Sequence, residues 1–291
     1  MCDKQSFRPC SPSPPVCPVC GSLDQSIYPA RCSPFFADRI WITAPFPMSF
    51  ISCNCCGFMY YYPLPRTSEL ARLYRGYRSD EYQQQRQQHE PEYTPEQNER
   101  LQAEAGERKS HIAAAITNYV LFAGIHSVLD YGGDAGQSIP DEFTNADKYV
   151  YDISGTPLPK GIQRCYPDTP KTFDYIQCCH VLEHVPDPHA VIKDILKFSH
   201  QQTRFYFEVP TESGFIIASL KFFSKHRELY RIYASIFNKD PEGMFPVMHE
   251  HLGLFTEPSL ILLMTMHGLK IKAIEIQDNT ISCVAVKKGA A

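Results

Sequence analysis

From residue 126 onward, short apolar runs alternate with longer segments of helical spacing, and this alternation limits the fold more than any other feature. Strands alternating with helices predict a mostly parallel sheet with helices on both faces. The last two strands are joined only by Asp278-Asn279, and so short a link forces an antiparallel hairpin. The expected strands are His126–Tyr131, Lys148–Asp152, Gly161–Cys165, Phe173–Cys179, Arg204–Val209, Leu269–Gln277 and Thr280–Lys287, and the expected helices are Asp187–Ser199, Ser213–Phe237 and Glu257–His267.

The rest of the chain divides into two further regions. With 291 residues, the chain is long enough for two domains, or for one domain with an extension. Residues 1–62 contain most of the cysteines, and we predict a small module there. Residues 63–125 have helical patterns, one beginning at Thr67 and another at Pro95, and we expect a helical linker. Residues 126–291 form the predicted α/β domain.

Charge and hydropathy exclude several classes of partner. There are 28 basic and 32 acidic residues, and a net charge of −4 argues against a general nucleic-acid binder. The first residues lack the apolar core of a secretory signal. The most apolar early stretch, Ile40 to Ile51, is short and is interrupted by Pro45 and Pro47, so it does not predict a membrane span. We therefore expect a cytoplasmic protein.

Eight of the twelve cysteines lie within the first 56 residues, in the pattern of a metal site. Cys17-Pro-Val-Cys20-Gly and Cys53-Asn-Cys-Cys56-Gly are two C-x-x-C-G knuckles, and two such pairs form a closed tetrahedral site suited to structural Zn²⁺. Clustered cysteines without a secretory signal favour metal over disulfides. Cys55 is an alternative ligand, but only Cys53 and Cys56 keep the spacing of the first pair.

The predicted strand ending near Asp130 runs into the glycine turn Gly132-Gly133-Asp-Ala-Gly136. Such a turn lets the backbone pass close under a ligand, and we expect a following helix to present free N–H groups there. A plain connection between strand and helix is the alternative. Twenty residues after Gly132, the next strand ends at Asp152, whose carboxylate is placed to accept hydrogen bonds from both ribose hydroxyls. Together these features predict a nucleoside-containing cofactor.

The charges beside the turn distinguish between two cofactors. A dinucleotide site favours G-x-G-x-x-G and a helix that holds the pyrophosphate. Here Asp130 and Asp134 flank the glycines, and their carboxylates repel a pyrophosphate but attract the cationic sulfonium and amino groups of S-adenosylmethionine. S-adenosylmethionine is therefore favoured over NAD.

Several motifs in order resemble those of class I S-adenosylmethionine-dependent methyltransferases. They are VLDYGGDAG, the strand-end Asp152, FDYIQCCHVLEHVPDP, FEVP and HEHLGLFTEPSLILLMTMHGLKI. The cysteine knuckles with CNCCGFMYYYPLP and the following EL-x-x-LY resemble the subfamily with an N-terminal zinc module. The resemblance spans residues 17–287 and implies a Rossmann-like seven-stranded sheet with an antiparallel last strand. It also implies an enzyme that methylates a small molecule, with a sugar or sugar nucleotide of polysaccharide or natural-product biosynthesis favoured.

The HVLEHVPDP segment has three interpretations. In the methyltransferase family, the backbone around Cys179 and His180 faces the methionine part of the cofactor. His180-Val-Leu-Glu183-His184 also matches the inverted zinc-peptidase motif H-x-x-E-H, which needs one continuous helix. Pro186 and Pro188 disfavour that helix, so we do not expect a peptidase. A simple strand-to-helix connection is the remaining alternative.

The densest ionisable cluster after the fifth strand is His249-Glu250-His251. An imidazole has a suitable pKa to accept a proton, and a neighbouring carboxylate can orient it. By resemblance to sugar methyltransferases, His251 with Glu250 is the predicted acid–base pair. Related C-methyltransferases have a tyrosine where this chain has Met248, and anchoring of the last helix is the alternative role. A homodimer is compatible with the sequence, and a non-catalytic scaffold or an NAD-dependent oxidoreductase are the alternative functions.

Overall fold

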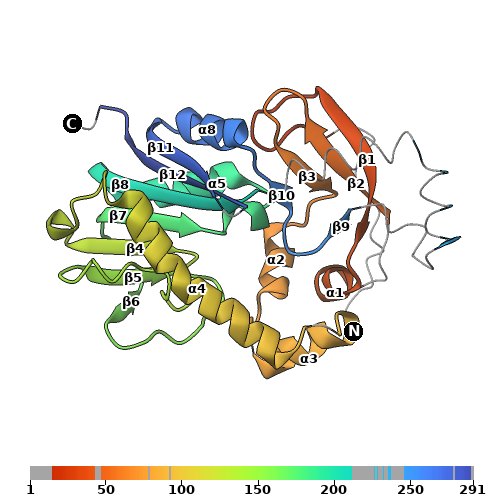
Figure 1. The fold of residues 1–291 in the computed structure, drawn as a ribbon, viewed down its shortest axis with the longest axis horizontal. Coiled ribbons are helices and arrows are strands. Elements are labelled where there is room, and N and C mark those ends of the chain that lie inside the picture. Colours follow the sequence, from red (N-terminus) through yellow and green to blue (C-terminus); the bar gives the residue numbers. More distant parts are fainter. Residues whose placement is uncertain are drawn as a thin grey trace.

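The computed structural model describes residues 15–42, 47–77, 79–91, 93–211, 246–277 and 279–289, with five isolated positions between 212 and 245. Apart from these five positions, the helix expected over Ser213–Phe237 lies outside the described residues. Two sheets are present, one of seven strands and one of five, and they lie side by side in Figure 1.

The seven-stranded sheet has the order β11-β12-β8-β7-β4-β5-β6. Its strands are β4 (Ser127–Tyr131), β5 (Asp147–Tyr151), β6 (Ile162–Arg164), β7 (Phe173–Cys179), β8 (Ser199–Pro210), β11 (Leu269–Gln277) and β12 (Thr280–Lys287). The pairs on either side of β4 and β7 are parallel, and only β12 runs against its neighbours. The sheet has the predicted Rossmann-like methyltransferase topology, including the antiparallel end.

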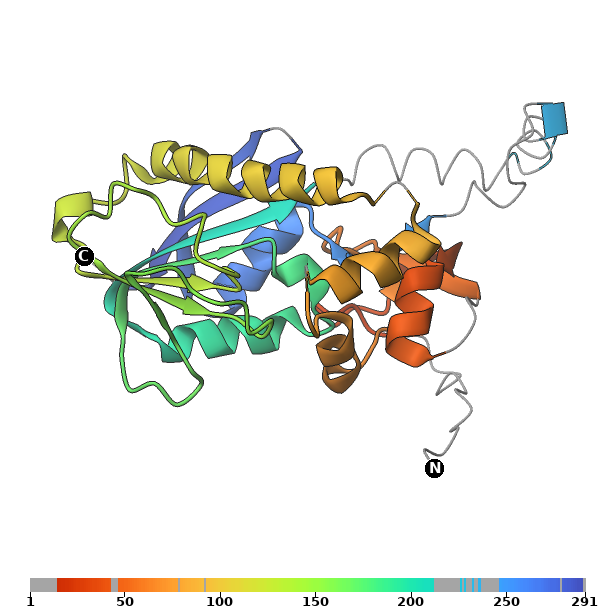
Figure 2. The same ribbon diagram turned by 90° about the horizontal axis from the view of Figure 1, so that it is seen from below.

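Helices cover both faces of this sheet, as the alternating pattern predicted. Figure 2 shows α4 (Pro95–Ile116) on one side and α5 (Pro188–Lys197) on the other, where α8 (Glu257–Met266) also packs. Alternate residues of β8 are divided between the two faces, because Phe205 and Phe207 join the cluster under α5 and α8 whereas Tyr206 joins the cluster under α4. None of the described helices is both long and apolar enough to cross a bilayer.

The segment after β4 differs from the expectation. The sequence predicted a helix directly after the glycine turn, but residues 132–146 form turns. Gly132, Asp134 and Gly136 have positive φ angles of 77°, 52° and 78°, which a right-handed helix does not accommodate. Buried Phe143 holds the segment against the core below α4. Turns rather than a helix therefore surround the site at this edge of the sheet.

The five-stranded sheet combines the N-terminal region with residues far along the chain. Its order is β10-β3-β2-β1-β9. The strands are β1 (Gln25–Cys32), β2 (Pro47–Cys53), β3 (Met59–Tyr62), β9 (Val247–Met248) and β10 (Gly253–Leu254). The N-terminal sheet thus includes two short strands from the α/β region, beyond the expected boundary at residue 62.

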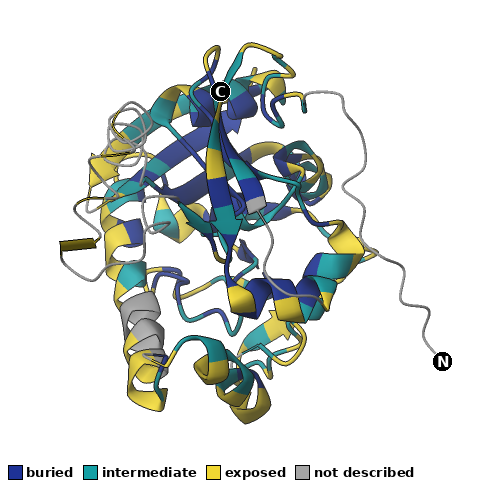
Figure 3. Ribbon diagram, turned by 90° about the vertical axis from the view of Figure 1, so that its right-hand side faces the viewer, coloured by how far each residue is buried: buried dark blue, intermediate teal, exposed yellow. Residues whose placement is uncertain are grey.

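Short helices cover the N-terminal sheet and connect it to the larger one. They are α1 (Pro34–Phe36), the π-helical η1 (Ala37–Trp41), α2 (Thr67–Leu73) and α3 (Asp80–His89), with the 3₁₀ turns η2 (Phe122–Gly124) and η3 (Leu182–His184) farther on. The helical linker expected over residues 63–125 therefore consists of α2, α3 and α4. Figure 3 shows buried residues running through the strands and exposed ones on the outer helices.

The two sheets share one hydrophobic contact region. Phe255 is completely buried, and its ring centroid lies 4.8 Å from that of Phe58. A Cβ atom at Gly253 would lie 2.4 Å from the Phe58 ring, so the chain reaches β3 this closely only because residue 253 is a glycine. Cys17 and Ile51 belong to the same core cluster as Leu260. The N-terminal region therefore shares a hydrophobic core with the α/β region.

Removing the ring at this junction is expected to destabilise the whole chain. We predict that Phe255→Ala lowers the free energy of unfolding by about 3–5 kcal/mol, because it leaves a cavity between the two sheets. Urea denaturation followed by circular dichroism measures the change. The control Ile276→Ala removes a side chain that is 57% exposed and should cost no more than about 0.5 kcal/mol. Equal effects of the two substitutions would contradict a shared core.

Candidate functional site

The predicted cofactor residues gather at the carboxyl ends of neighbouring strands. Asp130 lies near the end of β4, Asp152 follows β5, and Cys179 ends β7. These strands run parallel and adjacent, so their carboxyl ends meet at one edge of the sheet. Ligands of open α/β sheets bind at such an edge.

Close packing explains why all three of these positions in the turn are glycines. A Cβ atom at Gly132 would lie 2.3 Å from the Val181 side chain, and one at Gly133 would lie 2.2 Å from the Asp130 carboxyl carbon. A Cβ atom at Gly136 would lie 2.7 Å from Ile162. The turn therefore stays close to the strand ends because it has no side chains at these positions.

Asp152 joins the glycine turn to the loop after β5. Its Oδ2 atom accepts a hydrogen bond of 2.9 Å from the Asp134 backbone N–H, and its Oδ1 atom accepts one of 2.7 Å from the Ser154 N–H. Asp134 adopts the left-handed conformation, which aspartate tolerates. Each carboxylate oxygen accepts more than one hydrogen bond, so Asp152 keeps acceptor capacity for a hydroxyl.

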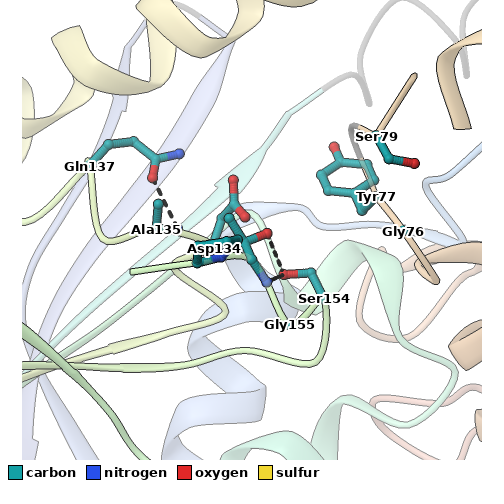
Figure 4. Close-up of a pocket in the computed structure, with 10 residues that line it drawn as sticks. Gly76, Tyr77, Ser79, Asp134, Ala135, Gln137, Ser154 and Gly155 are labelled. Carbon is teal, nitrogen blue, oxygen red and sulfur yellow. Dashed lines mark hydrogen bonds between the residues drawn. The ribbon is translucent and has the colours of Figure 1, made fainter. Parts of the chain in front are cut away.

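A cleft of 570 Å³ opens beside this turn (Figure 4). It is lined by Gly76, Tyr77, Ser79, Asp134, Ala135, Gln137, Ser154, Gly155, Thr156 and Pro157. Asp134, Ala135 and Gln137 come from the glycine turn, and residues 154–157 come from the loop after Asp152. Gly76, Tyr77 and Ser79 come from the connection between α2 and α3. The wall formed by Gly76, Tyr77 and Ser79 was not predicted from the sequence, because only a glycine interrupting a helical stretch marks it.

Asp130 lies under the turn and is almost entirely buried. Burial raises the pKa of its carboxyl group to about 7. Oδ2 accepts a hydrogen bond of 3.3 Å from the Ser138 hydroxyl, whereas Oδ1 has no hydrogen-bond partner among the described residues. A buried acceptor at this position suits a ligand with a donor or a positive charge.

Cys179 and His180, the other two residues predicted to bind the cofactor, have different positions at the strand end. The Cys179 side chain belongs to the core under α4, so only its backbone reaches the strand end. His180 has a φ of 54°, which directs its ring between two carboxylates. Nε2 lies 3.0 Å from Glu208 Oε1 and Nδ1 lies 3.2 Å from Glu183 Oε1. Burial alone would lower the pKa of His180, but these two carboxylates outweigh it and raise the pKa to about 9.

A second group of ionisable residues lies beside His180. Ligand atoms of Glu183, His184 and His251 lie within 4.8 Å of one another. Burial opposes the charge of Glu183, but the imidazoles of His180 and His184 outweigh it and lower the pKa of Glu183 to about 2. Burial lowers the pKa of His184. Because Leu182–His184 is a single 3₁₀ turn, the continuous helix of the H-x-x-E-H peptidases is absent here, as expected.

Glu250, the predicted partner of His251, has another role in the structure. Its Oε1 atom accepts a hydrogen bond of 2.7 Å from the Tyr82 hydroxyl and lies 2.8 Å from Arg86 Nη1. His249 Nδ1 lies 3.2 Å from Glu90 Oε1. The Glu250 carboxylate therefore holds α3 in place, and Glu183 is the buried carboxylate grouped with His251.

The four predicted zinc ligands converge in the N-terminal region. The Sγ atoms of Cys17 and Cys56 are 3.6 Å apart, and those of Cys20 and Cys53 are 3.4 Å apart. All four lie within 4.8 Å of one another, whereas Cys55 is exposed. The hydrogen bond with Cys56 is the main cause that lowers the pKa of Cys17, to about 5. A tetrahedral ion fits such a set of sulfur atoms.

Comparison with known proteins gave a family. The family model of the methyltransferase domain matches residues 74–274. No curated protein matches the chain. Among solved structures, magnesium protoporphyrin IX methyltransferase from Synechocystis PCC 6803 with bound SAH is 14% identical and has a TM-score of 0.44, over 63% of this chain and 84% of that one.

Two other solved structures have comparable sequence identity and TM-scores. The plantazolicin methyltransferase in complex with SAH is 11% identical, with a TM-score of 0.45 over 76% of this chain and 96% of that one. The mitomycin 7-O-methyltransferase is 12% identical, with a TM-score of 0.43 over 63% of this chain and 54% of that one.

The glycine turn provides a test of the cleft as a ligand site. We predict that Gly133→Ala weakens binding of SAH (S-adenosylhomocysteine) by about tenfold or more in calorimetry, because the new methyl group collides with Asp130 and displaces the turn. The control is Gly124→Ala, where a Cβ atom would make only an ordinary contact of 3.8 Å with Leu121. If both variants bind equally well, the turn does not contact the ligand.

Proposed function

Because the chain belongs to the methyltransferase domain family and is an S-adenosylmethionine-dependent methyltransferase, we propose that it methylates a small molecule at the carboxyl ends of β4, β5 and β7. The observation that carries the proposal is the joined pair of loops beside the 570 Å³ cleft, held together by the Asp152 carboxylate. Asp152 is placed to bind the ribose hydroxyls, and the turn at Gly132, Gly133 and Gly136 passes beneath the methionine part. The backbone of Cys179 and His180, at the carboxyl end of β7, is proposed to face the methionine part of the cofactor.

A binding experiment tests the cofactor. SAH should bind to the intact protein with an affinity in the micromolar range, and Asp152→Ala should weaken binding by about tenfold or more because the hydroxyls lose their acceptor. Calorimetry measures both, with Asp168→Ala, an exposed carboxylate, as the control. Absence of SAH binding by the unmodified protein would overturn the proposal, and binding of NAD instead would favour an oxidoreductase.

For the methyl acceptor, we propose only a chemical class. Resemblance to the zinc-module subfamily favours a sugar or sugar nucleotide, and the segment from Val247 to Phe255 brings ionisable side chains to the same edge as the cofactor site. The cytoplasmic location and the homodimer stay predictions.

The methyl donor is already activated, so the protein has to align the acceptor and assist removal of its proton. We propose that removal of this proton depends on His251. Glu183 is buried beside it and supplies the negative charge that the sequence analysis assigned to Glu250. Glu250 supports the same site indirectly through Tyr82 and Arg86.

His251→Asn is therefore expected to reduce turnover strongly, by about a hundredfold or more, while the affinity for SAH stays near that of the unmodified protein. Turnover is measured as SAH formation with a panel of sugar nucleotides. The matched control is His249→Asn, which alters an exposed imidazole two residues away. Unchanged turnover in His251→Asn would exclude this role.

We also propose that Cys17, Cys20, Cys53 and Cys56 bind one structural Zn²⁺ ion. Their sulfur atoms lie close enough for a shared ion, and a closed set of four thiolates leaves no coordination position for a substrate. Binding of the ion stabilises the surrounding fold, because the unfolded chain has no preformed site.

Elemental analysis should give one zinc ion per chain. Cys17→Ser should lose the ion and lower the melting temperature of the whole protein, since Cys17 belongs to the core cluster shared with α8. Cys55→Ser is the matched control and should keep the ion, because Cys55 lies outside the cluster. Protein purified without chelators and containing no zinc would contradict the assignment.

A further inference from the structure

We propose that Glu183, His184 and His251 form a second metal site, which binds a divalent cation where the acceptor meets the cofactor. The site is distinct from the cysteine cluster. The role that we assign to the ion rests on the proposed function, whereas binding of the ion does not.

The three residues come from two segments that backbone contacts hold together. Glu183 and His184 belong to η3, and His251 lies between β9 and β10. The Leu252 N–H donates a hydrogen bond of 2.7 Å to the Glu183 carbonyl oxygen. Because the main chain fixes this contact, the three potential ligand atoms remain within 4.8 Å of one another.

The hydrogen bond of His184 determines which ring nitrogen faces the site. Nδ1 lies 2.9 Å from the Glu250 carbonyl oxygen. A carbonyl oxygen only accepts, so Nδ1 carries the hydrogen, and the neutral ring has its lone pair on Nε2. Nε2 in turn lies 3.7 Å from Glu183 Oε1. Metal-binding histidines have this arrangement, in which the second ring nitrogen donates to a carbonyl or carboxylate.

The Glu183 carboxylate supports a cation independently. Its side chain is completely buried, and its Oε2 atom has no hydrogen-bond partner among the described residues. A buried carboxylate is costly unless a charge or hydrogen bonds compensate it. His180 Nδ1 approaches Oε1 to 3.2 Å from one side, whereas the lone pair of His184 approaches from another. A cation bound between Glu183 Oε1 and His184 Nε2 would add a second compensating charge to that of His180.

The ligand set indicates both the type of ion and its use. Two imidazoles and one carboxylate bind Mn²⁺, Fe²⁺ or Zn²⁺ and leave coordination positions open. Val181, two residues before Glu183, packs on Gly132 of the turn, so the proposed metal site lies on the segment that contacts the proposed cofactor pocket. An acceptor oxygen bound there would be stabilised as it becomes negative while its proton passes to water. His251 would then assist proton removal as a ligand of the ion.

This site does not restore the peptidase interpretation. In an H-x-x-E-H enzyme both histidines of the motif bind the metal. Here His180 lies between Glu183 and Glu208, and the second imidazole comes from His251.

Mn²⁺ provides a direct test, because it binds poorly to thiolates and loses its free electron paramagnetic resonance signal when bound. Protein with zinc in the cysteine cluster should bind one Mn²⁺ per chain, and Glu183→Gln should weaken this binding by about tenfold or more. The matched control is Asp174→Asn. Asp174 also pairs with an imidazole, that of His200, but lies at the opposite end of β7.

A second pair of variants covers the case in which Glu183→Gln does not fold. His184→Asn should lose Mn²⁺, whereas His200→Asn should retain it. No binding of Mn²⁺ or Zn²⁺ beyond the cysteine cluster up to about 1 mM, or unchanged binding in both Glu183→Gln and His184→Asn, would overturn the metal site. Full methyl transfer without the ion would overturn the role assigned to the ion but not its binding, whereas failure to bind SAH would overturn the proposed function and leave the Mn²⁺ result intact.

Discussion

The pairing of residues 247–254 with the N-terminal sheet is the constraint on which the site depends. After β8 the chain returns through β9, which extends β1, and β10, which extends β3. These two short pairings place Phe255 on Phe58 and bring His251 to η3. Without them, the imidazole of His251 would not be held beside Glu183, and the start of α8 would lose its contact with the N-terminal region.

Charge compensation decides how the strand ends are organised. Glu183 and Glu208 are both buried, and His180 lies between them with its pKa raised to about 9. Arg108 of α4 also lies 3.0 Å from Glu208. Two buried carboxylates so close together are tolerated because cations lie against them. This network fixes the left-handed turn at His180, and that turn sets the direction of η3.

Prediction from the sequence was most reliable where the signal is local. The strands of the large sheet, its antiparallel end, the paired knuckles and the acidic residue after β5 all follow from periodicity or spacing along a short stretch. It was wrong about the helix after the glycine turn. The positive φ angles of Gly132, Asp134 and Gly136 favour turns, and a glycine-rich stretch does not show in advance which conformation its residues adopt.

Residue order was sufficient to establish the α/β class, the methyltransferase motifs and the cysteine set, because each depends on neighbours in the chain or on a repeated spacing. Only the tertiary structure showed that β9 and β10 complete the N-terminal sheet, that Glu250 contacts Tyr82 and Arg86, and that Glu183 lies with His251. These relations join residues separated by tens to hundreds of positions. Their distances depend on how two sheets pack against each other, and periodicity along one chain contains no information about that packing.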